Sequence, residues 1–355
     1  MLRRGLKAVG IPLALILLLA DVYVGYVFID YHRLPDTDEA VAPAGEAART
    51  GQRVTIATWN LGFGAYSDDF GFFMDGGRES WAYSKDAVHE NLGHAIQVLK
   101  GLEADAVILQ ELDYDATRSY HVDEPALVRE AFEGWQSCFA QNYDSPFLLY
   151  PPRQPHGASR SGLLTLSRFG IDRAARRSLP VDTGLTRFLD LDRCYGKAWV
   201  PLEDGRHLVL YNTHLSAYSR DGTIAQKQLE ILLGDMLEEY RAGNYVVGGG
   251  DFNKDLLGDS ASIFGVSGES YTWNQPIPEG TIPAGLSLVN GLDADDPVPS
   301  CRNADGPYVK GKTFVTMLDG FIVSDNVQVI SCRVIDEGFV CSDHNPVVME
   351  FELQN

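Results

Sequence analysis

Tyr245-Val246-Val247-Gly248-Gly249-Gly250-Asp251-Phe252-Asn253 is the stretch that decides the fold of this 355-residue chain. Its apolar start predicts a buried strand, and its three glycines allow close approach of the backbone to other groups. Asp251 and Asn253 then follow at positions i and i+2. Side chains two residues apart on an extended chain point the same way, so we expect the carboxylate and the amide to face one phosphate. An Asx-type turn is the structural alternative.

Five further segments also join an apolar run to a polar side chain. They are Thr58-Trp59-Asn60, Leu109-Gln110-Glu111, Asn212-Thr213-His214-Leu215, Leu318-Asp319-Gly320-Phe321 and Ser342-Asp343-His344-Asn345-Pro346. Polar groups that end strands gather at the edge of a sheet, where ligands bind. Oxygen ligands with two His and no paired Cys suit Mg²⁺, or else Mn²⁺ or Ca²⁺, better than zinc. The set predicts a metal-dependent hydrolase of phosphate esters.

Each of these side chains also has a structural interpretation when it is taken alone. Glu111 could form a surface ion pair, Asn60 could be a turn residue, and either histidine could simply end a strand. A histidine that serves as a general base needs a carboxylate to orient its ring and stabilise its charged form. Asp319 is the candidate for this role beside His344. The structural alternatives lose weight because all six segments occur together and in order.

The six segments resemble the endonuclease/exonuclease/phosphatase superfamily, and the resemblance spans roughly residues 53–353. It implies an α/β fold, a four-layered α/β sandwich with two mixed β-sheets, which agrees with the alternation of strands and helices. The roles that it implies follow the motifs residue by residue. The metal residues are Glu111, Asn60 and Asp343, and the catalytic residues are His344 as general base, Asp319 as its partner, His214, Asp251 and Asn253.

Two departures from the family pattern narrow the subclass. Gly62 stands where abasic-site endonucleases carry an Asp, and Cys341-Ser342-Asp343-His344 stands where inositol 5-phosphatases have Trp-Cys-Asp-Arg. The resemblance therefore favours a deoxyribonuclease-like or sphingomyelinase-like phosphodiesterase.

The first thirty residues predict a membrane anchor. Three basic residues precede an apolar run of 22 residues at 8–29, and about 20 suffice to cross a bilayer. The basic excess on the N-terminal side places the N-terminus in the cytoplasm and the rest outside. Asp21 opposes insertion, and the apolar run before it would also fit a cleaved signal peptide. We favour an uncleaved single-pass anchor in the cell membrane, and both interpretations export the domain.

The chain is expected to have three parts. Residues 1–35 are the cytoplasmic N-terminus and transmembrane helix, residues 36–51 a flexible tether of small and polar residues, and residues 52–355 the catalytic domain, a monomer. Apolar runs predict strands at 54–59, 106–109, 162–166, 198–202, 208–212, 245–247, 321–323 and 347–351, and helical spacing predicts helices at 86–102 and 225–240. Long polar stretches at 65–85, 113–124, 143–160 and 255–302 are expected to be walls of a substrate cleft.

The net charge of the chain helps to choose between classes of substrate. Lys+Arg of 29 against Asp+Glu of 49 gives a formal net charge of −20, which opposes non-specific binding of nucleic acid. We therefore expect a lipid head group or a small phosphodiester as substrate. An extracellular nuclease that cleaves DNA or RNA is the alternative. A non-enzymatic binding protein on the same fold is a remote alternative, because no motif residue is missing.

Some other side chains have two interpretations. Aromatic residues in the long loops could contact lipid or stack on bases, or could form a small core of their own; they are Phe70, Phe72, Phe73, Trp81, Tyr83, Tyr271 and Trp273. Arg187 and Arg193 are candidate phosphate contacts. The five cysteines are expected to be free thiols, with a single bridge from Cys301 to Cys332 or Cys341 as the alternative.

Overall fold

A computed structural model describes residues 2–188, 190–217, 223–266, 271 and 273–354. One group of strands is β2 (Arg53–Asn60), β3 (Ala106–Ala116), β4 (Gln136–Asp144), β5 (Ser159–Ser167), β14 (Val327–Val334) and β15 (Val347–Leu353). A second group is β1 (Thr37–Ala40), β6 (Arg173–Ser178), β7 (Cys194–Pro201), β8 (His207–His214), β9 (Tyr245–Asp251), β10 (Leu286–Val289) and β13 (Asp319–Ser324). A short ribbon consists of β11 (Cys301–Arg302) and β12 (Val315–Thr316).

The α-helices are α1 (Leu2–Asp30), α2 (Lys85–Gly101), α3 (Glu124–Ala131), α4 (Thr223–Arg241) and α5 (Ser260–Ile263). The 3₁₀ helices are η1 (Gly62–Gly64), η2 (Phe73–Asp75), η3 (Thr117–Ser119) and η4 (Leu185–Phe188).

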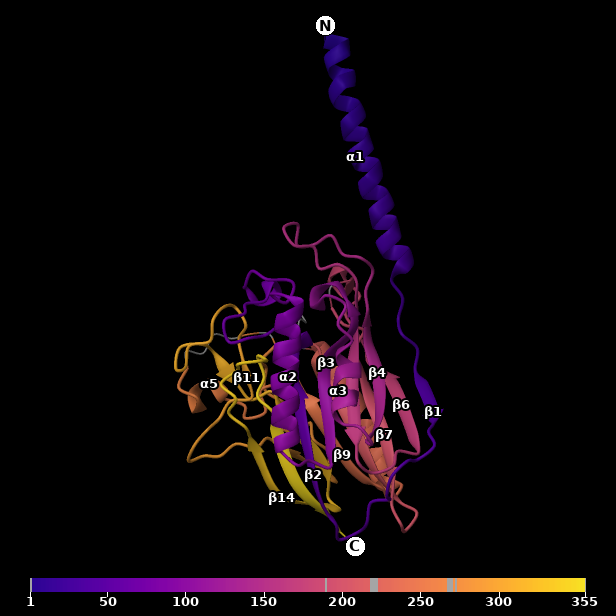
Figure 1. Ribbon diagram of the computed structural model, residues 1–355, viewed down its shortest axis with the longest axis vertical. Coiled ribbons are helices and arrows are strands. Elements are labelled where there is room, and N and C mark those ends of the chain that lie inside the picture. Colours follow the sequence, from indigo (N-terminus) through magenta and orange to yellow (C-terminus); the bar gives the residue numbers. More distant parts are fainter. Residues whose placement is uncertain (1, 189, 218–222, 267–270, 272, 355) are drawn as a thin grey trace.

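The strands form two mixed sheets that stack face to face (Figure 1). The six-stranded sheet has the order β14-β15-β2-β3-β5-β4, and the seven-stranded sheet has the order β1-β6-β7-β8-β9-β13-β10. Helices α2 and α3 pack on the six-stranded sheet and α4 packs on the other. The molecule is therefore the four-layered α/β sandwich that the sequence predicts.

Two parallel strand pairs set the position of the functional edge. β2 and β3 run parallel and are joined through α2, while β8 and β9 run parallel and are joined through α4. Apolar faces hold both helices in place, since α2 buries Val88 and Leu92 and α4 buries Leu229 and Leu233. The carboxyl ends of β2, β8 and β9 meet at one edge of the sandwich, because the helices return the chain to the opposite edge.

A buried polar link joins the two sheets beneath this edge. Asn212 of β8 donates hydrogen bonds to the carbonyl oxygens of Leu109 (3.0 Å) and Leu164 (3.1 Å) in the facing sheet. Gln110 Nε2 in turn donates to Asn212 Oδ1 at 2.7 Å. All polar atoms of the Asn212 side chain are thus satisfied inside the core, which fixes how the two sheets are positioned against each other.

Residues 36–51, expected to be a flexible tether before a domain that starts at residue 52, are instead part of the fold. Thr37–Ala40 pairs with β6 at the sheet edge. Asp38 accepts hydrogen bonds from Arg173 (2.7 Å) and Arg177 (2.8 Å), and Ala48 is fully buried in the core. Strand pairing with β6 and the two arginines that neutralise Asp38 hold the segment in place, a partnership that composition does not reveal.

Helix α1 projects away from the domain, at the end opposite the C-terminus (Figure 1). Its segment Ile11–Asp30 is the one helix of the described residues that is long and apolar enough to cross a membrane. By length and composition, a membrane span and a signal sequence look the same. The last turns of α1 contact the domain through the buried side chain of Val27 and its neighbours.

Candidate active site

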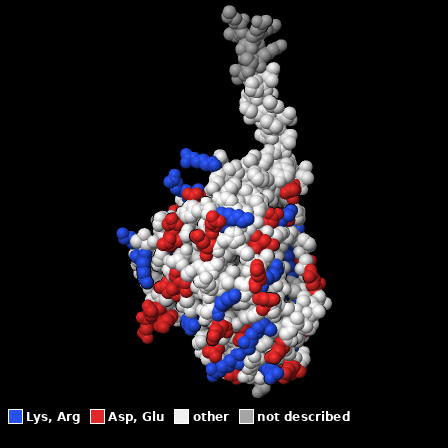
Figure 2. Space-filling model, viewed as in Figure 1, with Lys and Arg blue, Asp and Glu red and all other residues white. Residues whose placement is uncertain are grey.

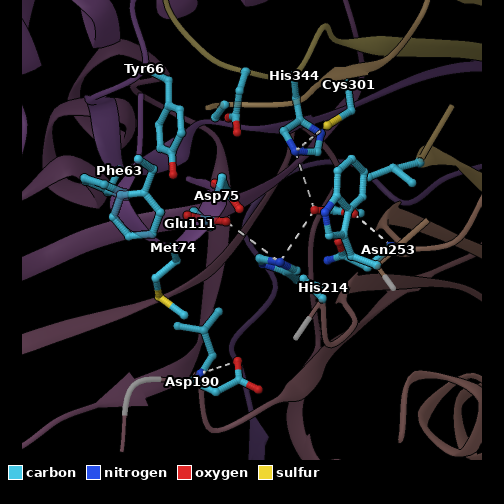
Figure 3. Close-up of a pocket in the computed structure, with 18 of the residues that line it drawn as sticks. Phe63, Tyr66, Met74, Asp75, Glu111, Asp190, His214, Asn253, Cys301 and His344 are labelled. Atoms are coloured by element: carbon cyan, nitrogen blue, oxygen red, sulfur yellow. Dashed lines mark hydrogen bonds and ion pairs between the residues drawn. The ribbon is translucent and has the colours of Figure 1, made fainter. Parts of the chain in front are cut away.

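A cleft opens at the sheet edge where β2, β8 and β9 end (Figure 3). Six of the eight predicted site residues line it: Glu111, His214, Asp251, Asn253, Asp343 and His344. The other two, Asn60 and Asp319, lie directly behind them and are hydrogen-bonded to them. The structure therefore brings the whole predicted set together.

All four long polar stretches contribute to the walls of this cleft, as expected. Met74, Arg118, His156 and Trp273 each come from a different stretch. In the last stretch, residues 267–270 and 272 lie outside the described residues. The walls give the cleft about 800 Å³ of empty space, part of it open to solvent.

His344 and Asp319 form a buried pair. His344 Nδ1 donates a hydrogen bond to Asp319 Oδ2 at 2.7 Å, and the ring turns Nε2 into the cleft, 3.7 Å from Asp251 Oδ2. Burial by itself would lower the pKa of His344, but the charges of Asp319, Cys301 and Asp251 outweigh it and raise this pKa well above its ordinary value. The carboxylate thus stabilises the charged ring and fixes which nitrogen faces the cleft.

Three further side chains, which the sequence analysis did not single out, hold this pair. Ser300 Oγ donates to Asp319 Oδ2 at 2.8 Å and accepts from the backbone N–H of Asp319 at 3.0 Å. Trp59 Nε1 donates to the carbonyl oxygen of His344 at 2.7 Å, and Ser342 Oγ accepts from the N–H of His344 at 3.1 Å. Trp59 and Ser342 lie inside the quoted motifs, whereas Ser300 lies in a polar stretch without a pattern that could reveal its role.

Asp251 lies at the centre of the cleft. It accepts hydrogen bonds from Asn60 Nδ2 at 3.1 Å and from the N–H of Asn253 at 2.9 Å. Burial raises the pKa of Asp251 to about 6; the charge of His344 opposes this rise and that of Asp319 adds to it. A carboxylate in this state can exchange a proton near neutral pH.

His214 has the opposite character to His344. Burial lowers the pKa of His214 well below its ordinary value, and the positive charges of Arg193, His344 and Arg118 lower it further. Its Nε2 lies 3.5 Å from Asp251 Oδ2 and 3.8 Å from Glu111 Oε1. The ring is therefore neutral, and it can donate one N–H to an oxygen in the cleft.

Glu111 is aimed into the cleft by an irregularity of β3. The register of β3 against β5 shifts between Leu109 and Leu112, and Glu111 adopts the left-handed conformation with φ 53°. Such a conformation is costly for a residue with a side chain and is found at functional sites. Asn60 Nδ2 donates to Glu111 Oε1 at 3.1 Å, so the amide holds this carboxylate as well as that of Asp251.

Asn253 departs from the expected geometry. Its φ of 45° is left-handed, so the chain turns after β9 and does not continue extended. Its N–H returns to Asp251 Oδ1, which is the Asx-type turn kept open above, and its Nδ2 donates to the carbonyl oxygen of Leu215 at 2.8 Å. Both Asp251 and Asn253 nevertheless line the cleft, because the turn brings them to the same side.

The residues present fit a divalent cation. Burial raises the pKa of Asp343 to about 6; the charges of His344 and Arg302 oppose the rise, and that of Glu111 adds to it. Two carboxylates that repel each other in a buried cleft are relieved by a cation. Within the described residues, no group of three or more His, Cys, Asp or Glu side chains is placed so that it could hold a metal ion. Mg²⁺ does not require one, since it binds through one or two carboxylates and keeps several waters.

The structure also bears on the alternatives left open for the aromatic residues of the loops, for Arg187 and Arg193, and for the cysteines. Phe70 and Phe72 are buried in the hydrophobic core that α2 forms with the six-stranded sheet, and Phe72 also lines the cleft. Arg187 packs on aromatic rings and is not among the residues that line the cleft. Arg193 does line it. All five cysteines are free thiols, as expected, and Cys301 Sγ lies 3.5 Å from His344 Nε2.

Solved structures share this fold. The chain resembles an endonuclease/exonuclease/phosphatase from Beutenbergia cavernae (TM-score 0.58, 18% identity, covering 85% of this chain and 72% of that one). It also resembles the human Nocturnin catalytic domain with bound sulfate (TM-score 0.52, 17% identity, 90% and 98% covered). A third is ANGEL2, a 2′,3′-cyclic phosphatase (TM-score 0.55, 15% identity, 91% and 99% covered). At such identities the likeness shows the fold alone.

The sequence itself carries the family assignment. A comparison with curated protein sequences finds no match. The sequence pattern of the Endonuclease/Exonuclease/phosphatase family matches residues 57–344, most of the chain, and includes every residue of the cleft discussed above. The chain therefore belongs to the endonuclease/exonuclease/phosphatase family, whose members hydrolyse phosphoester bonds.

Proposed function

We propose that the protein is a membrane-anchored, extracytoplasmic phosphodiesterase that requires a divalent cation, Mg²⁺ in the first place. Its substrate is a lipid head group or a small phosphodiester. The observation that carries this proposal is the buried Asp319–His344 pair, whose second ring nitrogen, Nε2, faces Asp251 across the cleft. Phosphodiester hydrolysis needs a group in this position to take the proton of the attacking water.

The reaction then follows from the positions of the side chains. His344 Nε2 accepts a proton from water, the resulting hydroxide attacks phosphorus, and the bond from phosphorus to the leaving oxygen breaks with its electron pair on that oxygen. The leaving oxygen takes a proton from solvent, and His344 returns its proton to solvent. Asp319 stabilises the charged ring that forms. Asp251 orients the water from the other side, and His214, which is neutral, donates its N–H to an oxygen of the phosphoryl group or of the leaving group.

Glu111 and Asp343 are the residues that would hold the cation, and Asn60 holds Glu111 in place. Asn60 Oδ1 accepts from the N–H of Gly62 at 3.0 Å, and its second lone pair leaves this oxygen able to join Glu111 and Asp343 as a ligand. A bound cation neutralises charge on the phosphoryl oxygens. Positive charge at this end of the cleft also favours the neutral form of His344 that a base requires.

The anchor supports an external, membrane-bound enzyme. α1 combines an apolar segment from Ile11 to Asp30 with basic residues at its N-terminal end. A helix of this length fits the hydrocarbon core of a bilayer, and the charge bias supports a domain outside the cytoplasm.

A nuclease is the second candidate. Trp273 lines the cleft, and its ring is stacked on that of Tyr271 with a centroid distance of 5.0 Å. Such an aromatic pair could stack on a nucleobase. The net charge of −20 favours the first candidate.

A panel assay tests the proposal. The full-length protein in detergent is offered bis-p-nitrophenyl phosphate, sphingomyelin, plasmid DNA and inositol phosphates, each with Mg²⁺ and with EDTA, and His344→Ala serves as the blank. We expect Mg²⁺-dependent cleavage of the small diester and of the lipid. Preferred cleavage of DNA would replace the first candidate by the second, and full activity in excess EDTA would contradict the proposed mechanism.

A further inference from the structure

An exposed apolar surface lies between α1 and the cleft. We call it the apolar loop, residues 147–150, in which Phe147, Leu149 and Tyr150 are 42%, 51% and 54% exposed. Beyond α1, the other large apolar side chains that are exposed in the described part of the chain occur singly; they are Tyr83, Ile231, Ile263, Val309, Ile330 and Val340. A cluster of exposed apolar side chains marks an interaction site, whereas single ones do not.

The apolar loop is fastened to the last turns of α1. The Tyr23 hydroxyl accepts a hydrogen bond from the N–H of Leu149 at 2.8 Å and donates to the carbonyl oxygen of Phe147 at 3.2 Å. The Tyr26 hydroxyl accepts from the N–H of Phe147 at 2.9 Å. The orientation of the loop relative to the helix is therefore fixed, and where α1 enters a bilayer, the loop lies at the point of entry.

A second contact fastens α1 to another wall of the cleft. The rings of Phe28 and Tyr31 pack edge-on against Phe188, with centroid distances of 5.0 and 5.1 Å. Just beyond the helix, the N–H of Leu34 donates to Asp192 Oδ2 at 2.6 Å, in the segment that carries cleft residues Asp190 and Arg193. Two walls of the cleft are thus tied to the end of the helix.

From the apolar loop an aromatic path leads to the mouth of the cleft. The ring of Tyr150 packs against Phe73 of η2 at 5.9 Å, and Phe73 in turn lies 6.1 Å from the ring of His156. His156 and Met74, the residue next to Phe73, both line the cleft. A chain of ring contacts, in which His156 is buried, therefore connects the exposed apolar loop with the rim of the site.

The orientation of the domain agrees with these contacts. The cleft lies at the edge where β2 ends. Figure 1 shows this edge on the side of α1 and opposite to the C-terminus. In Figure 2 the described part of α1 shows no charged side chain on its visible side, and charged side chains begin at the surface of the domain. Tyrosines at the end of a membrane helix are typical of the lipid–water interface. Arg153, at the tip beyond the apolar loop, is exposed and has no ion pair among the described residues, so it is free to meet lipid phosphates.

We propose that the mouth of the cleft lies on the outer surface of the bilayer, with the apolar loop inserted among the lipid head groups. This inference rests on the membrane anchor of the proposed function and deepens it. The substrate is then a phosphoester carried by a membrane lipid, which reaches His344 along the membrane plane without leaving the bilayer. If the cleft faced only solvent, the exposed side chains of Phe147 and Leu149 beside the helix would have no apolar partner.

A depth measurement tests this orientation. The full chain is reconstituted into phosphatidylcholine/phosphatidylglycerol vesicles after labelling Leu149→Cys with an environment-sensitive fluorophore, and lipids that carry a nitroxide serve as quencher. Ile330→Cys is the matched control, since Ile330 is an exposed apolar side chain of β14, 39% exposed. Wild-type protein gives the background from the native thiols. We expect a blue-shifted, quenched signal at residue 149 and an unquenched signal at residue 330.

The outcomes separate the two proposals, because bis-p-nitrophenyl phosphate turnover is measured on the same vesicles. Turnover without quenching at residue 149 would overturn the inference and leave the phosphodiesterase standing. Quenching without turnover would support the membrane surface and contradict the proposed activity. Failure of the full chain to enter vesicles, or equal quenching at both positions, would overturn the inference.

Discussion

Asp319 Oδ2 accepts a hydrogen bond from His344 Nδ1 at 2.7 Å, in a part of the core where the Asp319 side chain is fully buried. A carboxylate there is costly unless it is paired, so the arrangement serves the ring that it orients. The two residues are 25 positions apart in the sequence. They meet because β13 begins, and β15 is entered, at the same edge of the sandwich.

Ser300 should act through this pair. Ser300→Ala removes the hydroxyl from Asp319 Oδ2, a hydrogen bond to a charged group that is worth about 1.5–3 kcal/mol. We expect turnover to fall roughly 10- to 100-fold with little change in KM, because the substrate does not contact Ser300. Steady-state kinetics on bis-p-nitrophenyl phosphate measures the effect, and Ser331→Ala, an exposed serine on β14, is the control. A change confined to KM would contradict the positioning role.

Glu111 should determine the affinity of the enzyme for Mg²⁺. Glu111→Gln keeps the size of the side chain but removes its charge, so we expect a weaker affinity for Mg²⁺ and a strongly reduced turnover. Titration of activity and of binding heat with Mg²⁺ measures both. Glu130→Gln, an exposed residue of α3, should change neither. Unaltered Mg²⁺ affinity in Glu111→Gln would show that the metal is held elsewhere.

Residues 36–51 should contribute to stability. A chain that begins at residue 52 loses the β1 pairing, the Asp38 hydrogen bonds and the burial of Ala48, whereas a chain that begins at residue 36 keeps them. We expect the shorter chain to be less stable by about 2 kcal/mol or more. Urea unfolding of the two chains measures the difference. Equal stabilities would show that the segment only rests on the surface.

Gly62 should tolerate no side chain. It adopts φ +52°, and a Cβ there would lie 2.5 Å from Tyr66 Cδ2. Gly205 also has a left-handed φ but nothing within 4 Å, so it is the matched control. Gly62→Ala should cost about 1–3 kcal/mol more than Gly205→Ala, since the backbone strain of about 1 kcal/mol is common to both. Equal losses in thermal unfolding would mean that Tyr66 moves aside.

The sequence revealed those parts of the fold in which periodic apolar runs dominate. The strand at 54–59 and the helices at 86–102 and 225–240 appear as β2, α2 and α4 with boundaries shifted by one or two residues. β1 could not be predicted, because Thr37-Asp38-Glu39-Ala40 has no apolar face and is held by arginines more than 130 positions away.

The site residues also divide into those that the sequence reveals and those that it does not. Glu111, Asp251 and His344 follow strands, so their meeting at one edge is predictable. Ser300 contacts Asp319 because β11 and β12 pair into a ribbon. The sequence around Ser300 has no pattern that would predict this contact.

The central claim is that His344 and Asp319 act as one unit. A double-mutant cycle of His344→Ala and Asp319→Asn, measured as turnover of bis-p-nitrophenyl phosphate in saturating Mg²⁺, tests it directly. The control cycle uses His121→Ala and Asp115→Asn, an exposed pair with a similar contact of 2.6 Å. The account predicts that His344→Ala lowers turnover about 10²–10⁴-fold. It also predicts that the double variant loses far less than the product of the single losses, and that the control cycle changes nothing. Strictly multiplicative losses, or a His344→Ala variant near the wild-type rate, would contradict it.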